Sequence, residues 1–249
     1  MRYFLELAFD GTAYHGWQRQ PNAHSVQQEL EEALSVLLGQ PIEVVAAGRT
    51  DAGVHAAHMV VHFDYSQAFD VQALIHRLNR FLPEALVISK LVEVHPEAHA
   101  RFDAISRTYR YRISTRKDPF SERFTWQLHQ PLDLESMNLA AQYLIGTHDF
   151  ECFSKSHTDV KTFICTVAYA RFTQQAHEIH FEIRADRFLR NMVRAIVGTL
   201  VEVGWHKRAL SSIPELIASK SRSEAGVSVP AKGLSLIAIE YPELRLHAN

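Results

Sequence analysis

The sequence predicts an α+β fold in which the strands pair largely antiparallel and the helices pack on the sheet. Three observations support this fold class. Several short stretches alternate apolar and polar residues, as strands do, and several longer ones repeat apolar residues at helical spacing behind a capping residue. The two kinds of stretch follow each other in mixed order. The chain has 249 residues, 47% of them apolar, which suffices for one large core or two modest ones.

The first half of the chain predicts four strands and two helices. Residues 3–9 alternate, but both faces carry apolar side chains, which indicates a central strand. Ser25 begins a capping box and a helix that Gly39 ends. Asp70 caps a second helix, which stops at Pro83. The other strands are expected over residues 43–47, 58–64 and 87–93.

The second half repeats this theme. Residues 106–114, which read SRTYRYRIS, alternate cleanly and predict a strand. Asp133 caps a helix that Gly146 closes, and apolar spacing predicts a long helix over residues 189–204. Further elements are expected at residues 178–186 (strand), 210–218 (short helix) and 234–241 (strand).

A loop-like stretch near residue 100, which reads HPEAHARFDAIS, is the best candidate for a linker. We therefore expect two α/β halves. Residues 1–100 form one half, and residues 101–249 form the other.

Charge and cysteine content limit the class of protein. The formal net charge is −2, but residues 1–100 carry 6 Lys and Arg against 12 Asp and Glu, whereas residues 101–249 carry 20 against 16. A local basic groove is compatible with this balance, and so is an uneven scatter of surface charge. The sequence contains no apolar run of about 18 residues, so no membrane-spanning helix is expected. Cys152 and Cys165 are too few for a disulfide framework, so we expect a reducing cytoplasm.

One turn stands out chemically. Residues 48–56 read GRTDAGVHA, with Asp51 between two glycines and Arg49 two residues before it. In an extended stretch the two side chains point to the same side, and an arginine beside a carboxylate keeps it ionised. Asp51 is therefore a candidate nucleophile. The pattern alone is more typical of a turn-forming or capping aspartate and of an ordinary Arg–Asp salt bridge.

The turn resembles the signature of the tRNA pseudouridine synthase A family, and so do further segments in the same order over nearly the whole chain. These segments are FDGTAYHGWQRQ (Phe9–Gln20), HARFDAISRTYRYRI (His99–Ile113), GTHDFECF (Gly146–Phe153), RFLRNMVRAIVGTLVEVG (Arg187–Gly204) and AGVSVPAKGLSLIAIEY (Ala225–Tyr241). The one departure noted is Val229, where the family more often has alanine.

The resemblance implies a fold, an activity and site residues. The pseudouridine synthase fold has two similar ferredoxin-like halves joined into a mixed, largely antiparallel sheet with flanking helices. The implied reaction isomerises uridine to pseudouridine at tRNA nucleotides 38, 39 and 40, in the anticodon stem-loop, and family members are homodimers. Asp51 would be the catalytic nucleophile, Arg49 would orient and ionise it, and Tyr109 would contact the target base. Without the resemblance, Tyr109 and Tyr111 read as two core aromatics on one strand.

Several arginines are candidates for binding tRNA phosphates. Arg187, Arg190 and Arg194 are spaced three and four apart, so on a helix they would form one stripe. Arg110 lies on the predicted strand with Arg112. The alternative for each is an ordinary solvated arginine.

Other functions remain possible. They are a pseudouridine synthase acting on another RNA and a non-catalytic RNA-binding protein of the same fold. A carboxylate-based glycoside hydrolase needs a second, paired carboxylate, for which the sequence shows no motif. No P-loop, dinucleotide-binding motif or metal box is present, so no cofactor or metal is expected. The three histidines His55, His58 and His62 span a turn and a strand, which is poor spacing for zinc.

Overall fold

The computed structural model describes residues 1–156 and 160–246. The chain divides into two compact units, and each is described by itself. One unit contains Met1–Ser106 together with the C-terminal segment from Leu236, and the other contains Arg107–Ser235. The last strand therefore belongs to the first unit, which the boundary expected near residue 100 did not include. Hydrogen bonds explain this membership, because the Ile105 N–H donates to the Glu240 carbonyl at 2.8 Å and the Tyr241 hydroxyl donates to the Ala100 carbonyl at 2.6 Å.

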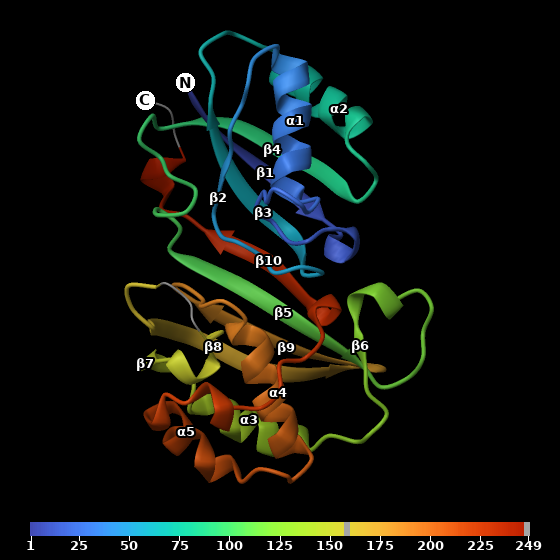
Figure 1. Ribbon diagram of the computed structural model, residues 1–249, viewed down its shortest axis with the longest axis vertical. Coiled ribbons are helices and arrows are strands. Elements are labelled where there is room, and N and C mark those ends of the chain that lie inside the picture. The colour runs from blue at the N-terminus through green and yellow to red at the C-terminus, as the bar shows by residue number, and fades with distance from the viewer. Residues whose placement is uncertain (157–159, 247–249) are drawn as a thin grey trace. The chain divides into compact units, whose positions relative to one another are not determined.

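The first unit is a sheet with two helices beside it. Its strands follow the order β4 (Leu86–Val94), β1 (Arg2–Phe9), β3 (His55–Asp64) and β10 (Leu234–Glu240), and the short β2 (Val45–Ala46) also pairs with β3. β1 pairs antiparallel with both of its neighbours, which confirms that it is a central strand. Helices α1 (Val26–Leu38) and α2 (Val71–Phe81) lie side by side, and α2 packs against β4 (Figure 1).

The predicted helix caps are confirmed. The Ser25 hydroxyl accepts from the Gln28 N–H at the start of α1, and Gly39 ends that helix with a left-handed φ of 74°. The carboxylates of Asp70 and Asp133 accept backbone N–H groups at the starts of α2 and α3 (Leu134–Gln142). These caps satisfy amide groups that have no partner within their own helices.

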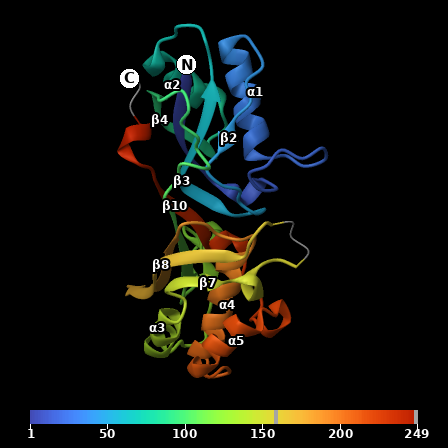
Figure 2. The same ribbon diagram turned by 90° about the vertical axis from the view of Figure 1, so that its left-hand side faces the viewer.

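The second unit has the same kind of construction. Its antiparallel strands follow the order β5 (Ser106–Ser114), β9 (Glu178–Ala185), β8 (Ile164–Gln175) and β7 (Gly146–Asp149), and β6 (Trp126–Gln127) pairs parallel with β5. Besides α3, it contains α4 (Met192–Gly204) and α5 (Ile213–Ser219). Helix α3 packs against both α4 and β8 (Figures 1 and 2). The α+β class with mostly antiparallel pairing is thus confirmed.

Some element boundaries differ from those predicted. The α3 helix ends at Gln142, and Gly146, with a φ of 108°, begins β7 instead of closing the helix. The α4 helix begins at Met192 instead of residue 189, because Asn191 takes a left-handed φ of 67°. Strands β6, β7 and β8 were not predicted. In β8 a register shift between Val167 and Tyr169 interrupts the alternation that marks a strand.

No helix in the part of the chain that the structure describes is long and apolar enough to cross a membrane.

Candidate active site

The Asp51 turn is a tight reversal that leads directly into β3. The Val54 N–H donates to the Asp51 carbonyl at 3.1 Å, and Gly53, at the third position, has a φ of 74°. Such a turn requires positive φ at that position, which glycine adopts without steric cost. The Asp51 side chain is half-buried and that of Arg49 is exposed. The carboxylate of Asp51 therefore stands at the first position of a tight turn.

The N-terminal motif holds this turn through backbone contacts. The Trp17 N–H donates to the Thr50 carbonyl at 3.2 Å, and the Gly53 N–H donates to the Tyr14 carbonyl at 3.3 Å. The approach is close enough to exclude side chains, since a Cβ atom at Gly16 would lie 2.5 Å from the Thr50 oxygen. Two segments that are far apart in sequence therefore form one backbone assembly around Asp51.

The same exclusion operates at the far end of the turn. A Cβ atom at Gly11 would lie 2.1 Å from the Val54 carbonyl oxygen. The Gly11 N–H donates to Nδ1 of the buried His55 at 3.0 Å, and a carboxylate oxygen of Asp10 lies 3.1 Å from the same nitrogen. His55 thus fixes the start of β3 to the N-terminal motif.

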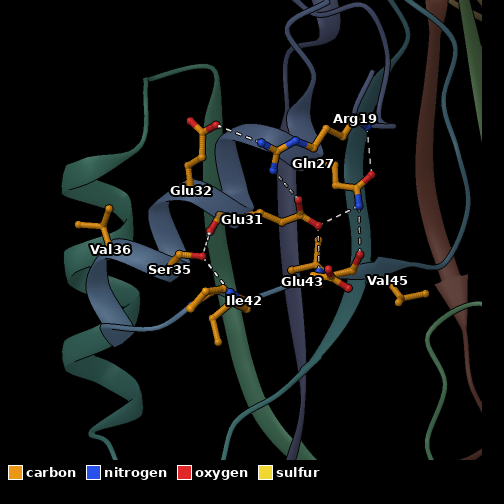
Figure 3. Close-up of a pocket in the computed structure, with 11 residues that line it drawn as sticks. Arg19, Gln27, Glu31, Glu32, Ser35, Val36, Ile42, Glu43 and Val45 are labelled. Atoms are coloured by element: carbon orange, nitrogen blue, oxygen red, sulfur yellow. Dashed lines mark hydrogen bonds and ion pairs between the residues drawn. The ribbon is translucent and has the colours of Figure 1, made fainter. Parts of the chain in front are cut away.

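The strand that leads into the turn is held by side chains of α1 (Figure 3). Glu31 accepts the Val44 N–H at 3.1 Å, and the Gln27 amide donates to the Val44 carbonyl at 3.3 Å and to Glu31 at 2.9 Å. Arg19, from the N-terminal motif, donates its backbone N–H to Gln27 and places its guanidinium 3.3 Å from Glu31. The segment before the turn and the N-terminal motif are therefore both tied to one buried carboxylate.

These residues line a pocket of about 740 Å³. Its walls carry three carboxylates, from Glu31, Glu32 and Glu43, against the single guanidinium of Arg19 (Figure 3). An excess of negative charge repels RNA phosphates. We therefore assign the pocket to the support of the turn and not to substrate binding.

The three neighbouring histidines each have a different partner. His55 contacts Gly11, Nε2 of His58 lies 3.4 Å from Glu6, and His62 accepts the Ala100 N–H at 3.1 Å. Burial lowers the pKa of His62 to about 4. Within residues 1–156 and 160–246, no group of three or more His, Cys, Asp or Glu side chains could hold a metal ion.

The two tyrosines of β5 differ in environment. The Tyr111 side chain is fully buried, and its hydroxyl donates to the Pro230 carbonyl at 2.8 Å. Burial raises the pKa of Tyr111. Tyr109 is only half-buried, and its ring meets Phe188 edge-on with centroids 5.1 Å apart. Tyr111 is thus a core residue, whereas Tyr109 keeps part of its ring accessible.

Arg110 is held in an ion pair. Its guanidinium lies 2.7 Å from Glu182, which is opposite it on β9, and Arg112 makes two 2.8 Å hydrogen bonds to Glu178. Both arginines alternate with Tyr109 and Tyr111 along the strand, so they lie on the other face of the sheet. A cross-strand pairing therefore accounts for Arg110 without a ligand.

The predicted stripe of three arginines on one helix is wrong. Because α4 begins at Met192, only Arg194 is helical, and Arg187 and Arg190 lie in the preceding turn. Arg187 donates to the Thr162 carbonyl at 3.2 Å, and Nε of Arg194 donates to the Val229 carbonyl at 2.7 Å. Arg190 is exposed. The three side chains therefore lie in different local environments. Their proposed contacts with RNA stay predictions.

Comparison with known proteins identifies the class. A model of the family described as tRNA pseudouridine synthase matches residues 7–103 and 140–242, so both units carry its features. The chain belongs to the tRNA pseudouridine synthase family, whose members are isomerases.

Individual relatives agree with this assignment. The tRNA pseudouridine synthase A of Bacteroides fragilis is 51% identical over 244 residues, which cover 97% of each chain. That of Parabacteroides distasonis is 50% identical over 243 residues, covering 97% of this chain and 96% of the other. The more distant protein of the same name from Moorella thermoacetica is 44% identical over 241 residues, covering 95% and 98%. The family resemblance inferred from the motifs is confirmed.

The support around Asp51 was not predicted from the sequence. Gly11 and Gly16 lie in a motif that the family resemblance uses, but nothing in the spacing shows that they face the turn. Glu31 occupies an ordinary position on an amphipathic helix. No spacing distinguishes Glu31, because it lies at the border of the apolar face that Leu30, Ala33 and Leu34 form.

Proposed function

We propose that this chain isomerises uridine to pseudouridine at nucleotides 38, 39 and 40 of the tRNA anticodon stem-loop, with Asp51 as the catalytic carboxylate. One observation carries the proposal. In a member of this family, the single aspartate of the signature turn is held by the backbone of the N-terminal motif and by a buried acid behind it. A turn that only reversed the chain would not need this support.

The reaction needs little besides a placed carboxylate. The N1–C1′ bond breaks, the uracil turns, and a C5–C1′ bond forms, after which C5 loses a proton and N1 gains one. Asp51 either attacks C1′ to form a covalent ester or stabilises positive charge on the ribose while the base departs, as carboxylates do in glycoside chemistry. Atoms and electrons balance in both routes without an oxidant, a reductant or an imported group, and we propose no cofactor.

The other predicted residues receive supporting roles. Arg49 keeps Asp51 ionised and oriented, and its exposed side chain is also able to meet a phosphate. Tyr109 holds the uracil by stacking with the accessible part of its ring. Arg187, Arg190, Arg194 and Arg110 bind phosphates, which offsets the few kcal/mol that extrusion of the target base costs. Of the four, Arg110 must give up its ion pair with Glu182 to do so.

We further propose that the protein works as a homodimer in the cytoplasm. A twofold arrangement would let one subunit bind the body of the tRNA while the other holds the target uridine. The two cysteines are buried free thiols, which suits a reducing compartment.

The deciding experiment is incubation with an unmodified tRNA transcript, followed by mapping of pseudouridine at each position. We expect product only at nucleotides 38–40, no product from Asp51→Asn, and nearly unchanged tRNA affinity for that variant. Asp70→Asn is the matched control, because asparagine also caps a helix, and it should retain full activity.

Three other results would each reject part of the proposal. Pseudouridine at other tRNA positions, or in another RNA only, would reject the proposed target nucleotides. If the wild-type chain bound tRNA tightly but formed no pseudouridine, the protein would be a non-catalytic RNA-binding protein. Full turnover by Asp51→Asn would reject the assignment of Asp51 as the catalytic carboxylate.

A further inference from the structure

The loop between β5 and β6 presents a phenylalanine to solvent. Phe120 is 93% exposed, which is the largest exposure of any large apolar side chain in the described chain. The loop reads TRKDPFSERF over residues 115–124, and we call it the Phe120 loop. Isolated apolar residues on a surface are common, so the exposure carries weight only with the features that surround it.

The loop is shaped by its own hydrogen bonds. The Asp118 carboxylate accepts the Phe120 N–H at 2.9 Å, and the Asp118 carbonyl accepts the Ser121 N–H at 3.3 Å. At its ends, the Ser114 hydroxyl donates to the Arg116 carbonyl at 2.7 Å and the Thr125 hydroxyl donates to the Ser121 carbonyl at 3.0 Å. The outward position of Phe120 is therefore built into the loop.

The charge around Phe120 is positive. The loop contains three exposed cations, Arg116, Lys117 and Arg123, and none of them forms an ion pair within the residues that the structure describes. Its two acids are used locally, because Asp118 accepts the Phe120 N–H and Glu122 pairs with Lys232. An exposed aromatic ring flanked by exposed cations is the combination that binds unpaired nucleic acid, with bases on the ring and phosphates on the cations.

The Phe120 loop lies outside the segments that the family model matches. The family match covers residues 7–103 and 140–242, and the loop falls in the stretch between them.

We propose that the Phe120 loop is a tRNA-binding surface, in which Phe120 stacks on an unpaired base while Arg116, Lys117 and Arg123 contact phosphates. The proposal rests on the proposed function only in taking tRNA as the ligand, and it does not require catalysis. RNA is favoured over a protein partner because the three exposed cations outnumber the two acids of the loop, whereas an apolar protein contact would not need them.

The test measures the affinity of the full-length protein for an unmodified tRNA transcript over a series of salt concentrations. Phe120→Ala should weaken binding about tenfold, and Phe120→Trp should retain it, because tryptophan also stacks. The triple variant R116Q/K117Q/R123Q should weaken binding and lower the slope of log Kd against log salt by about 2, or about 0.7–0.9 for each phosphate that the variant no longer neutralises.

The matched control is on α2. Phe81 is 53% exposed and lies one turn from the exposed Arg77, so F81A/R77Q removes the same kinds of group elsewhere. We expect it to leave the affinity and the slope unchanged. Melting temperatures of all variants should stay within about 2 °C of wild type, because the substituted side chains are exposed.

Two results would overturn the proposal. One is unchanged affinity and slope in both Phe120→Ala and the triple variant. The other is a shift in molar mass by light scattering for Phe120→Ala with tRNA affinity retained, which would assign the loop to contact with a second copy of the chain. These outcomes are separate from the proposed function, because wild-type protein that binds tRNA but forms no pseudouridine would reject only the catalytic assignment.

Discussion

The Glu31 carboxylate accepts the backbone N–H of Val44 at 3.1 Å, so a helix side chain takes the place that a neighbouring strand would fill. The Val44 carbonyl is satisfied in the same way by Gln27. Six residues lie between Val44 and Asp51, and the two-residue β2 is the one regular element among them. The position of the turn therefore depends on polar side chains as well as on sheet pairing.

We predict that Glu31→Gln lowers the free energy of unfolding by about 1–2 kcal/mol, because a charge-assisted hydrogen bond is replaced by a weaker one and Arg19 loses the shorter of its two ion pairs. Turnover by the folded protein should fall as well, since a displacement of about 1 Å at a catalytic group costs up to a hundredfold. Urea unfolding and single-turnover rates with saturating enzyme measure the two effects. Glu32→Gln, at an exposed neighbour, is the control, and equal effects in both variants would refute the special position of Glu31.

Gly16→Ala should reduce both stability and turnover. Its φ is 94° and the new Cβ atom would meet the Thr50 oxygen at 2.5 Å, so the Asp51 turn must shift. Gly39→Ala isolates the cost of backbone strain, because φ is 74° there but nothing lies within 4 Å of the new atom. We expect Gly39→Ala to lose about 1 kcal/mol with normal turnover. If Gly16→Ala behaves in the same way, the contact with the turn has no part in catalysis.

Substitutions at Arg190 and Arg194 should differ in their effects on tRNA binding and on the stability of the fold. Arg190→Ala removes an exposed cation and should weaken tRNA binding with a smaller salt dependence, and because the side chain is exposed the melting temperature should change little. Arg194→Ala also removes the 2.7 Å hydrogen bond to the Val229 carbonyl, and it should lower stability by about 1–2 kcal/mol. Thermal unfolding and salt-dependent binding of the pair check this difference. An unchanged salt slope for Arg190→Ala would exclude that residue from the RNA contact.

His62 should make the fold sensitive to mild acid. Burial, with smaller contributions from Arg2 and His99, lowers its pKa from the ordinary 6.5 to about 4. The unfolded chain therefore binds the proton more readily than the folded one between these values. The stabilisation is complete above pH 6.5 and is lost as the pH falls toward 4, by roughly 3 kcal/mol.

His62→Gln should flatten this part of the stability profile, measured by urea unfolding between pH 4 and pH 7. Glutamine can still accept the Ala100 N–H but does not titrate in this range. A profile for His62→Gln that matches wild type would assign the acid sensitivity to other groups.

The sequence was informative where local chemistry decides the structure. Ser25, Asp70 and Asp133 each cap a helix as predicted, because a short polar side chain before an apolar repeat has few other uses. Strand β5 matches its predicted range, since SRTYRYRIS alternates without interruption. The start of α4 was misplaced because helical spacing continues through Leu189, whereas the backbone of Asn191 does not follow it.

The sequence offers candidate residues for the site, whose catalytic roles stay predictions, but it does not show what supports them. Asp51 and Arg49 are close in sequence and belong to a specific motif. The contacts of Gly16 with Thr50 and of Glu31 with Val44 join residues 13 to 34 positions apart. Such pairs depend on the path of the folded chain, which the periodicity of the sequence does not indicate.

The course of the chain also bears on how the protein is made. Arg107–Ser235 is continuous, so this unit is able to fold as soon as it leaves the ribosome. The unit that carries Asp51 begins the chain but needs Leu236 onward for its last strand. Its assembly therefore waits for translation to pass residue 240, and a nascent chain that stalls earlier would hold the Asp51 turn on an incomplete sheet with an open edge.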